Sequence, residues 1–110
     1  MSKKKVDVEF EKSSGNVFAD LGFPNPEQEM VRARLALQIY RIIKARKLTQ
    51  VQAAKILGIQ QPSVSRLMNG RSGEYSVERL MDFLTDLGQD VQITVRPTRR
   101  EHGQVSVVVA

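Results

Sequence analysis

Apolar residues recur at helical spacing in two long stretches of the chain. The first stretch covers residues 26–46 and the second covers residues 77–87. Spacings of three and four residues place side chains on one face of a helix. The apolar positions of the two stretches are, in order, Leu35, Ile39, Ile42 and Ile43, and then Leu80, Phe83, Leu84 and Leu87. The pattern therefore predicts a long helix over residues 26–46 and a last helix over residues 77–87.

Between these two stretches, residues 49–70 show a shorter pattern, with a glycine at its centre. Apolar residues predict one helix over residues 50–57 and a second over residues 61–68, with Val64 and Leu67 facing inward. Thr49 is a suitable N-cap for the first helix, and Gly58 suits a turn with a left-handed backbone. This is the helix-turn-helix pattern, in which the second helix enters the DNA major groove.

The period changes to two near the C-terminus. Val91, Ile93 and Val95 alternate with polar residues up to Pro97, and residues 105–109 form a second β-prone run. The two runs predict a strand or a hairpin. Because an isolated hairpin is marginally stable in water, we expect these strands to pack on the helices or to pair with another subunit. We favour a homodimer that shares a small sheet.

The N-terminal segment carries weaker signals. Residues 6–10 alternate like an edge strand, although disorder is equally compatible with so charged a segment. Residues 17–21 predict one helical turn, whose Phe18 and Leu21 we expect to pack on the domain's own core rather than on a partner. The predicted organisation is an arm over residues 1–25, a helix-turn-helix domain over residues 26–90 and a β extension over residues 91–110.

Charge is distributed unevenly along the chain, whose net charge is +5. No Asp or Glu occurs between Met30 and Gly73, a span that contains the helix-turn-helix pattern. The nine basic residues of this span are Arg32, Arg34, Arg41, Lys44, Arg46, Lys47, Lys55, Arg66 and Arg71. The sign then reverses, and the following acidic residues are Glu74, Glu78, Asp82, Asp86 and Asp90. A basic span without acids indicates a face that meets a polyanion, while the row of Glu78, Asp82 and Asp86 along the last helix is typical of a solvated face.

The composition argues against an enzyme. The chain has no cysteine, and its one histidine, His102, lies beside a loop glycine. There is no glycine-rich phosphate loop and no set of paired metal ligands, so we expect no cofactor and no metal. No apolar run reaches membrane length and the N-terminus lacks a signal region, which predicts a cytoplasmic protein without a membrane partner.

The residues of the helix-turn-helix pattern also resemble a known family. Thr49-Gln50, Ala53-Ala54, Leu57-Gly58-Ile59, residues 61–65 and residues 67–70 resemble the core of Cro/repressor-type (XRE) regulators. Residues 15–22 and 76–80 resemble the branch that contains HigA-like antitoxins. Together with the periodicity, this resemblance implies a mainly α, lambda-repressor-like bundle of four to five helices, with a short C-terminal β-strand or hairpin used in dimerisation.

The start of the second helix of such a motif points into the groove, where base edges are recognised. The candidate base-reading residues are Gln60, Gln61, Pro62, Ser65 and Arg66. The candidate phosphate-contacting residues are Gln50, Ser63, Asn69, Arg71 and, more weakly, Lys55. Gln61 can pair with adenine and Arg66 can reach guanine or a phosphate, whereas Pro62 lacks a donor and contacts at most a thymine methyl. Few direct base contacts are therefore expected, with DNA shape supplying the remainder.

The function predicted on these grounds is sequence-specific binding of double-stranded DNA by a dimeric repressor. The resemblance to HigA-like antitoxins implies a second role, the neutralisation of a RelE/HigB-type toxin whose promoter the protein also represses. Candidate toxin contacts are residues 6–21 and the acidic last helix. The alternatives are a stand-alone XRE-type regulator without a toxin, and a helix-turn-helix module that binds only proteins.

Overall fold

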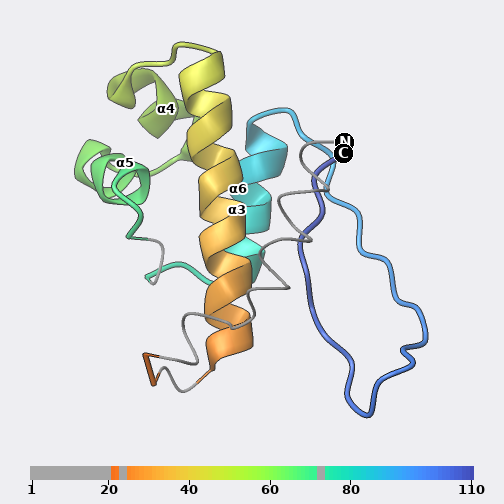
Figure 1. Cartoon of the computed structure of the whole chain (residues 1–110). Coiled ribbons are helices and arrows are strands. Elements are labelled where there is room, and N and C mark those ends of the chain that lie inside the picture. Colours follow the sequence, from red (N-terminus) through yellow and green to blue (C-terminus); the bar gives the residue numbers. More distant parts are fainter. Residues whose placement is uncertain (1–20, 23–24, 72–73) are drawn as a thin grey trace. The chain divides into compact units, whose positions relative to one another are not determined.

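Four α-helices make up the regular structure of the residues that the computed structural model describes, which are 21–22, 25–71 and 74–110. They are α3 (Pro26–Ala45), α4 (Gln50–Leu57), α5 (Gln61–Met68) and α6 (Val77–Asp86), shown in Figure 1. All four predicted helices are confirmed, and the predicted ends of the first and last lie one residue beyond the observed ends. Among these helices none is long and apolar enough to cross a membrane.

The ends of α4 follow from local side-chain and backbone chemistry. The Gln52 N–H donates to Thr49 Oγ1 at 3.1 Å, and the Thr49 N–H donates to Gln52 Oε1 at 2.8 Å. These two bonds form a capping box, which satisfies N–H groups that a helix start leaves without partners. At the other end Gly58 adopts a left-handed conformation, with φ 70° and ψ 34°. This turn ends α4 and directs the chain into α5.

The chain divides into two compact units, and the helix-turn-helix lies within the unit formed by residues 32–93. In this unit α4 packs against both α5 and α6. Arg46 joins two further parts of the unit, because its Nη1 donates to the carbonyl oxygen of Leu87 at 3.1 Å. The buried apolar side chains of the unit are Leu35, Ala36, Ile39, Ile43, Ala53, Leu57, Val64, Leu67, Leu80, Phe83, Leu84 and Leu87. The core thus holds α5 by its inner face and leaves its outer face exposed.

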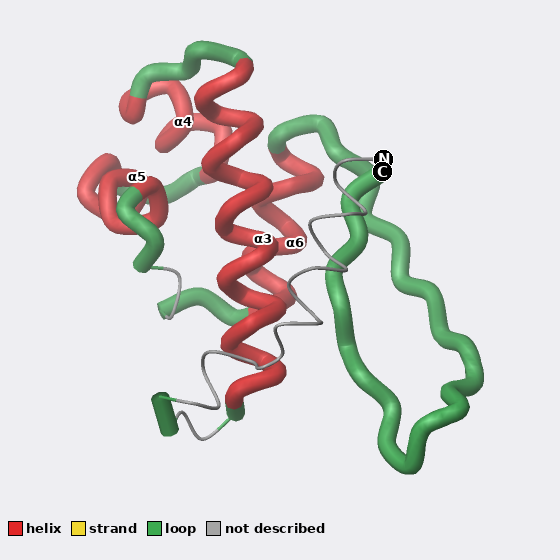
Figure 2. The backbone as a smooth tube through the Cα atoms, viewed as in Figure 1, coloured by secondary structure: helices red, strands yellow, loops and turns green. Residues whose placement is uncertain are grey.

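The prediction of C-terminal strands is wrong for this structure. No residue in the described part of the chain belongs to a β-strand, and Figure 2 shows the C-terminal segment as loop throughout. Ile93 and Val95 are 74% and 91% exposed, so their alternation with polar residues does not separate a buried face from a solvated one. A strand needs a packed face and a partner for its backbone hydrogen bonds, and alternation alone supplies neither.

The second unit comprises residues 1–31 and 94–110, of which residues 21–22, 25–31 and 94–110 are described. Within it the Val105 N–H donates to Glu27 Oε2 at 3.3 Å. The strand predicted over residues 6–10 lies outside the described residues, as does nearly all of the helical turn predicted over residues 17–21. The domain boundaries at residues 25 and 90 stay a prediction.

Candidate nucleic-acid interface

Two glutamines and a proline are exposed to solvent at the start of α5. Gln60 is the N-cap, with an extended backbone at φ −76° and ψ 151°, and Gln61 and Pro62 are the first two helical residues. All three are exposed. Pro62 fits here without loss, because the N–H that it lacks would have no partner within the helix. The structure therefore brings Gln60, Gln61 and Pro62 together at one exposed helix end, and their contact with bases stays a prediction.

The remainder of α5 alternates between packing and exposure. Val64 and Leu67 are 0% and 2% exposed and hold the helix on the core. Arg66 is exposed, one helical turn beyond Pro62, so it lies along the same helix as the exposed glutamines. Ser65 is half-buried, which leaves less of its side chain available to a ligand. Of the predicted base-reading residues, Ser65 is therefore the least accessible.

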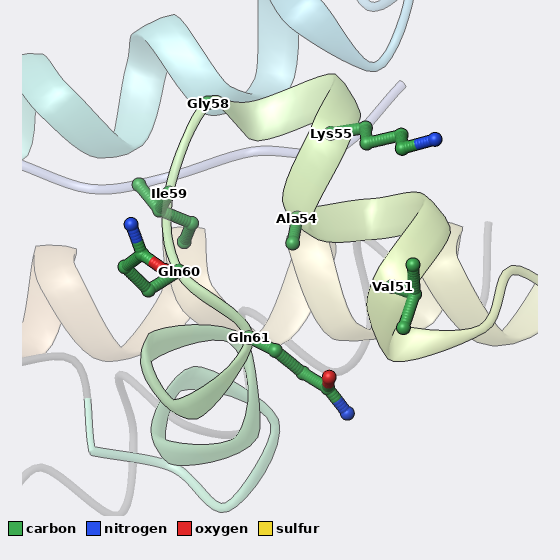
Figure 3. A pocket seen from close by; sticks show the side chains of 7 residues that line it. All are labelled: Val51, Ala54, Lys55, Gly58, Ile59, Gln60 and Gln61. Atoms are coloured by element: carbon green, nitrogen blue, oxygen red, sulfur yellow. The ribbon is translucent and has the colours of Figure 1, made fainter.

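A shallow open hollow of about 310 Å³ lies where α4 and α5 meet. It is lined by Val51, Ala54, Lys55, Gly58, Ile59, Gln60 and Gln61. Figure 3 shows Gln61 projecting outward from the start of α5, while Lys55 projects from α4 away from the two glutamines. Val51 is 52% exposed at its edge. The hollow thus combines an apolar wall with two side-chain amides, which donate and accept hydrogen bonds.

Arg66 is held by two side chains. Its Nε lies 2.9 Å from Glu74 Oε1, and its Nη2 donates to Ser63 Oγ at 3.1 Å. The hydrogen bond that Arg66 donates to Glu74, and the negative charge of that carboxylate, raise the pKa of Arg66 above its ordinary value. Ser63, predicted as a phosphate contact, is half-buried and already accepts a hydrogen bond from Arg66. The role of Glu74 was missed by sequence analysis, which noted it only as the first acidic residue after the basic span.

The other predicted phosphate contacts are dispersed around the two helices of the motif. Gln50 is exposed in the first turn of α4, beside the capping box. Asn69 is the C-cap of α5, and Arg71 follows it; both are exposed. Lys55 is exposed in the last turn of α4. Each is therefore accessible to a phosphate, and their contacts with DNA stay a prediction.

The basic span does not contribute all of its charges to one face. Arg46 is engaged with the Leu87 carbonyl and therefore has a structural role. The charge of Arg66 is partly neutralised by the nearby carboxylate of Glu74.

Among the described residues no group of three or more His, Cys, Asp or Glu side chains is placed to hold a metal ion.

Comparison with known proteins agrees with the helical fold. A family model described as a helix-turn-helix domain matches residues 17–96 of the chain. The chain belongs to the helix-turn-helix domain family. The matched residues include all four described helices and the start of the C-terminal segment.

Two individual proteins refine the comparison. A solved structure of a candidate XRE-family transcriptional regulator superposes with a TM-score of 0.74 at 42% identity, covering 79% of this chain and all of that one. A candidate antitoxin, HigA2 of Mycobacterium tuberculosis, is 38% identical over 61 residues, which are 56% of this chain and 60% of the relative. The resemblance to XRE-type regulators with a HigA-like branch is therefore confirmed. The family and fold are those of transcriptional regulators, which are not enzymes.

Proposed function

We propose that this helix-turn-helix protein is a sequence-specific DNA-binding repressor that contacts the major groove through the start of α5. The observation that carries the proposal is the exposed row formed by Gln60, Gln61, Pro62 and Arg66 on a helix whose opposite face is buried. Glutamine amides and an arginine guanidinium are the groups that recognise adenine and guanine edges. The acid-free span from residue 30 to residue 73 supports an approach to phosphates.

The proposed repressor acts as a dimer, because one α5 covers only a few base pairs. Support comes from the C-terminal segment, which exposes Ile93, Val95, Val105 and Val108. Exposed apolar residues favour burial against another chain. Two copies would place their α5 helices on half-sites about one helical turn of DNA apart.

The dimer is tested by sedimentation equilibrium of the full chain. Ile93→Glu should shift the population toward monomer, since it places a charge among the exposed apolar residues of the C-terminal segment. Thr94→Glu adds the same charge at the neighbouring polar position and should leave the dimer intact. A wild-type chain that sediments as a monomer at the concentrations used for DNA binding would remove this part of the proposal.

An antitoxin role is the finer part of the proposed function. The name of the mycobacterial relative supports it, although the match spans 60% of that relative's length. We propose a RelE/HigB-type toxin as the partner and repression of the shared promoter as the regulatory outcome. The exposed acidic residues Glu78, Asp82 and Asp86 of α6 are suited to a basic partner. The second predicted contact region, residues 6–21, lies almost wholly outside the described residues.

A gel-shift series with the upstream region of the gene, run across salt concentrations, tests the repressor role. Specific binding should exceed binding to a shuffled duplex at every salt concentration. Co-purification with the product of the adjacent gene separates an antitoxin from a stand-alone regulator. Binding to a protein partner with no preference for any duplex would instead favour a protein-binding module.

A further inference from the structure

The guanidinium of Arg66 forms an ion pair with a residue that lies outside α5. Glu74 lies eight residues further along the chain, yet its Oε1 is 2.9 Å from Arg66 Nε. From the other side Ser63, on the preceding turn of α5, accepts a hydrogen bond from Arg66 Nη2 at 3.1 Å. A guanidinium carries five N–H bonds, so these two contacts leave most of its donors for a further partner. The Arg66 side chain is thereby held in place while most of its N–H donors remain available for a ligand.

The position of Glu74 is itself secured by the residues that follow it. The ring of Tyr75 meets the ring of buried Phe83 edge-on, with centroids 5.0 Å apart and planes at 79°. The hydroxyl of Ser76 then caps α6 by accepting from the Arg79 N–H at 3.0 Å. Tyr75 and Ser76 are anchored in this way at the start of α6. Their anchoring holds the neighbouring Glu74 in a position where its carboxylate contacts Arg66.

The carboxylate changes what the arginine can recognise. A bare guanidinium attracts any phosphate through its net charge, and this attraction is independent of DNA sequence. A guanidinium and a carboxylate that form an ion pair together carry little net charge when seen from a distance. The guanidinium N–H groups that the pair does not use can still donate direct hydrogen bonds. Both partners are nearly half exposed, at 45% and 42%, so the pair is accessible to a ligand that approaches the exposed face of α5.

We propose that Glu74 is a specificity-determining residue, which suppresses phosphate binding by Arg66 and orients its guanidinium toward a base edge. The inference rests on the proposed DNA-binding function and adds a residue that lies outside the recognition helix. Orientation reduces the side-chain entropy lost on binding, and charge cancellation lowers the affinity for non-specific DNA. Both effects raise the ratio of specific to non-specific affinity.

The test uses the full chain and a duplex enriched by that chain from a random pool, with a shuffled duplex of the same length. Binding is measured by fluorescence anisotropy at several salt concentrations. Glu74→Gln should tighten binding to the shuffled duplex and steepen the dependence of log K on log salt by about one unit. The ratio of specific to shuffled affinity should fall by about fivefold or more, the lower end of the effect of one mismatched base pair.

Two control experiments show whether the effect depends on the ion pair between Arg66 and Glu74. Glu101→Gln makes the same change of charge at an exposed position with no proposed role and should leave the ratio unchanged. In an Arg66→Ala background the effect of Glu74→Gln on the ratio should vanish. Since Glu74 is exposed, circular dichroism and the melting temperature should remain those of the wild type.

Three results would overturn the inference. They are an equal change on both duplexes, the same ratio for Glu74→Gln and Glu101→Gln, or an effect of Glu74→Gln that persists without Arg66. A wild-type chain that enriches no duplex and shows no preference contradicts the proposed function instead, so the two failures are distinguishable.

Discussion

Replacement of Gly58 by alanine isolates the backbone requirement of the turn between α4 and α5. Gly58 has φ 70° and ψ 34°, and its N–H donates to the Ala54 carbonyl at 2.8 Å. A Cβ built at this position meets no heavy atom within 4 Å beyond its chain neighbours. The substitution therefore introduces no steric clash, and its cost is confined to the left-handed conformation itself.

The magnitude follows from two opposing effects. A left-handed backbone costs a residue with a Cβ about 1–2 kcal/mol. Alanine also lowers the conformational entropy of the unfolded chain, an effect that stabilises by about 0.4–1 kcal/mol at unstrained sites and here offsets only part of the left-handed cost. The expected net loss is about 1 kcal/mol in the free energy of unfolding, or a melting temperature lower by roughly 4–8 °C for a domain of this size.

The assay is thermal and urea unfolding followed by circular dichroism, with Gly103→Ala as the matched control. Gly103 lies outside the left-handed region, and an added Cβ would approach Thr98 Cγ2 at 3.9 Å, an ordinary contact. Gly103→Ala should be neutral or slightly stabilising. Gly58→Asn should lose less stability than Gly58→Ala, because asparagine tolerates the left-handed region better. Equal stability of the two alanine variants would refute the reasoning.

Three further substitutions test other parts of the account. Thr49→Ala removes the acceptor of the capping box and should cost about 1 kcal/mol in urea unfolding, while Thr49→Ser should retain most of the stability; equal losses would exclude the hydroxyl as the cause. Phe83→Ala empties a fully buried site under Tyr75 and should cost about 3–5 kcal/mol, with Phe83→Leu losing less; a loss below 1 kcal/mol would contradict the burial. Arg66→Ala should weaken specific binding by about 1–3 kcal/mol if Arg66 contacts a base; a uniform loss across sequences with a flatter salt dependence would assign it to phosphate, and no loss would remove it from the site.

The helical part of the fold was predictable because its determinants are local. Helical spacing identified the buried face of each helix, and Thr49 and Gly58 marked the two ends of α4 through their own chemistry. The exposed residues at the start of α5 followed from the same pattern, because burial of Val64 and Leu67 orients the other face outward. Each of these inferences depends on residues within about one or two helical turns.

Features that depend on distant partners were not predictable. Alternation at Val91, Ile93 and Val95 predicted a strand, but it does not specify what pairs with the strand or covers its apolar face. The bond between Arg46 and the Leu87 carbonyl joins residues 41 positions apart, and no local pattern distinguishes Arg46 from its basic neighbours. The Arg66–Glu74 pair is similar, because Glu74 lies beyond the end of α5, where helical periodicity no longer relates the two residues.

The central claim is that α5 recognises a specific DNA sequence, and the ratio of two dissociation constants tests it most directly. One constant is measured for a duplex enriched from a random pool by the full chain, and the other for its shuffled counterpart, both at about 0.15 M salt. The account predicts a preference on the order of 10³-fold or more for the enriched duplex. A ratio near one would contradict it.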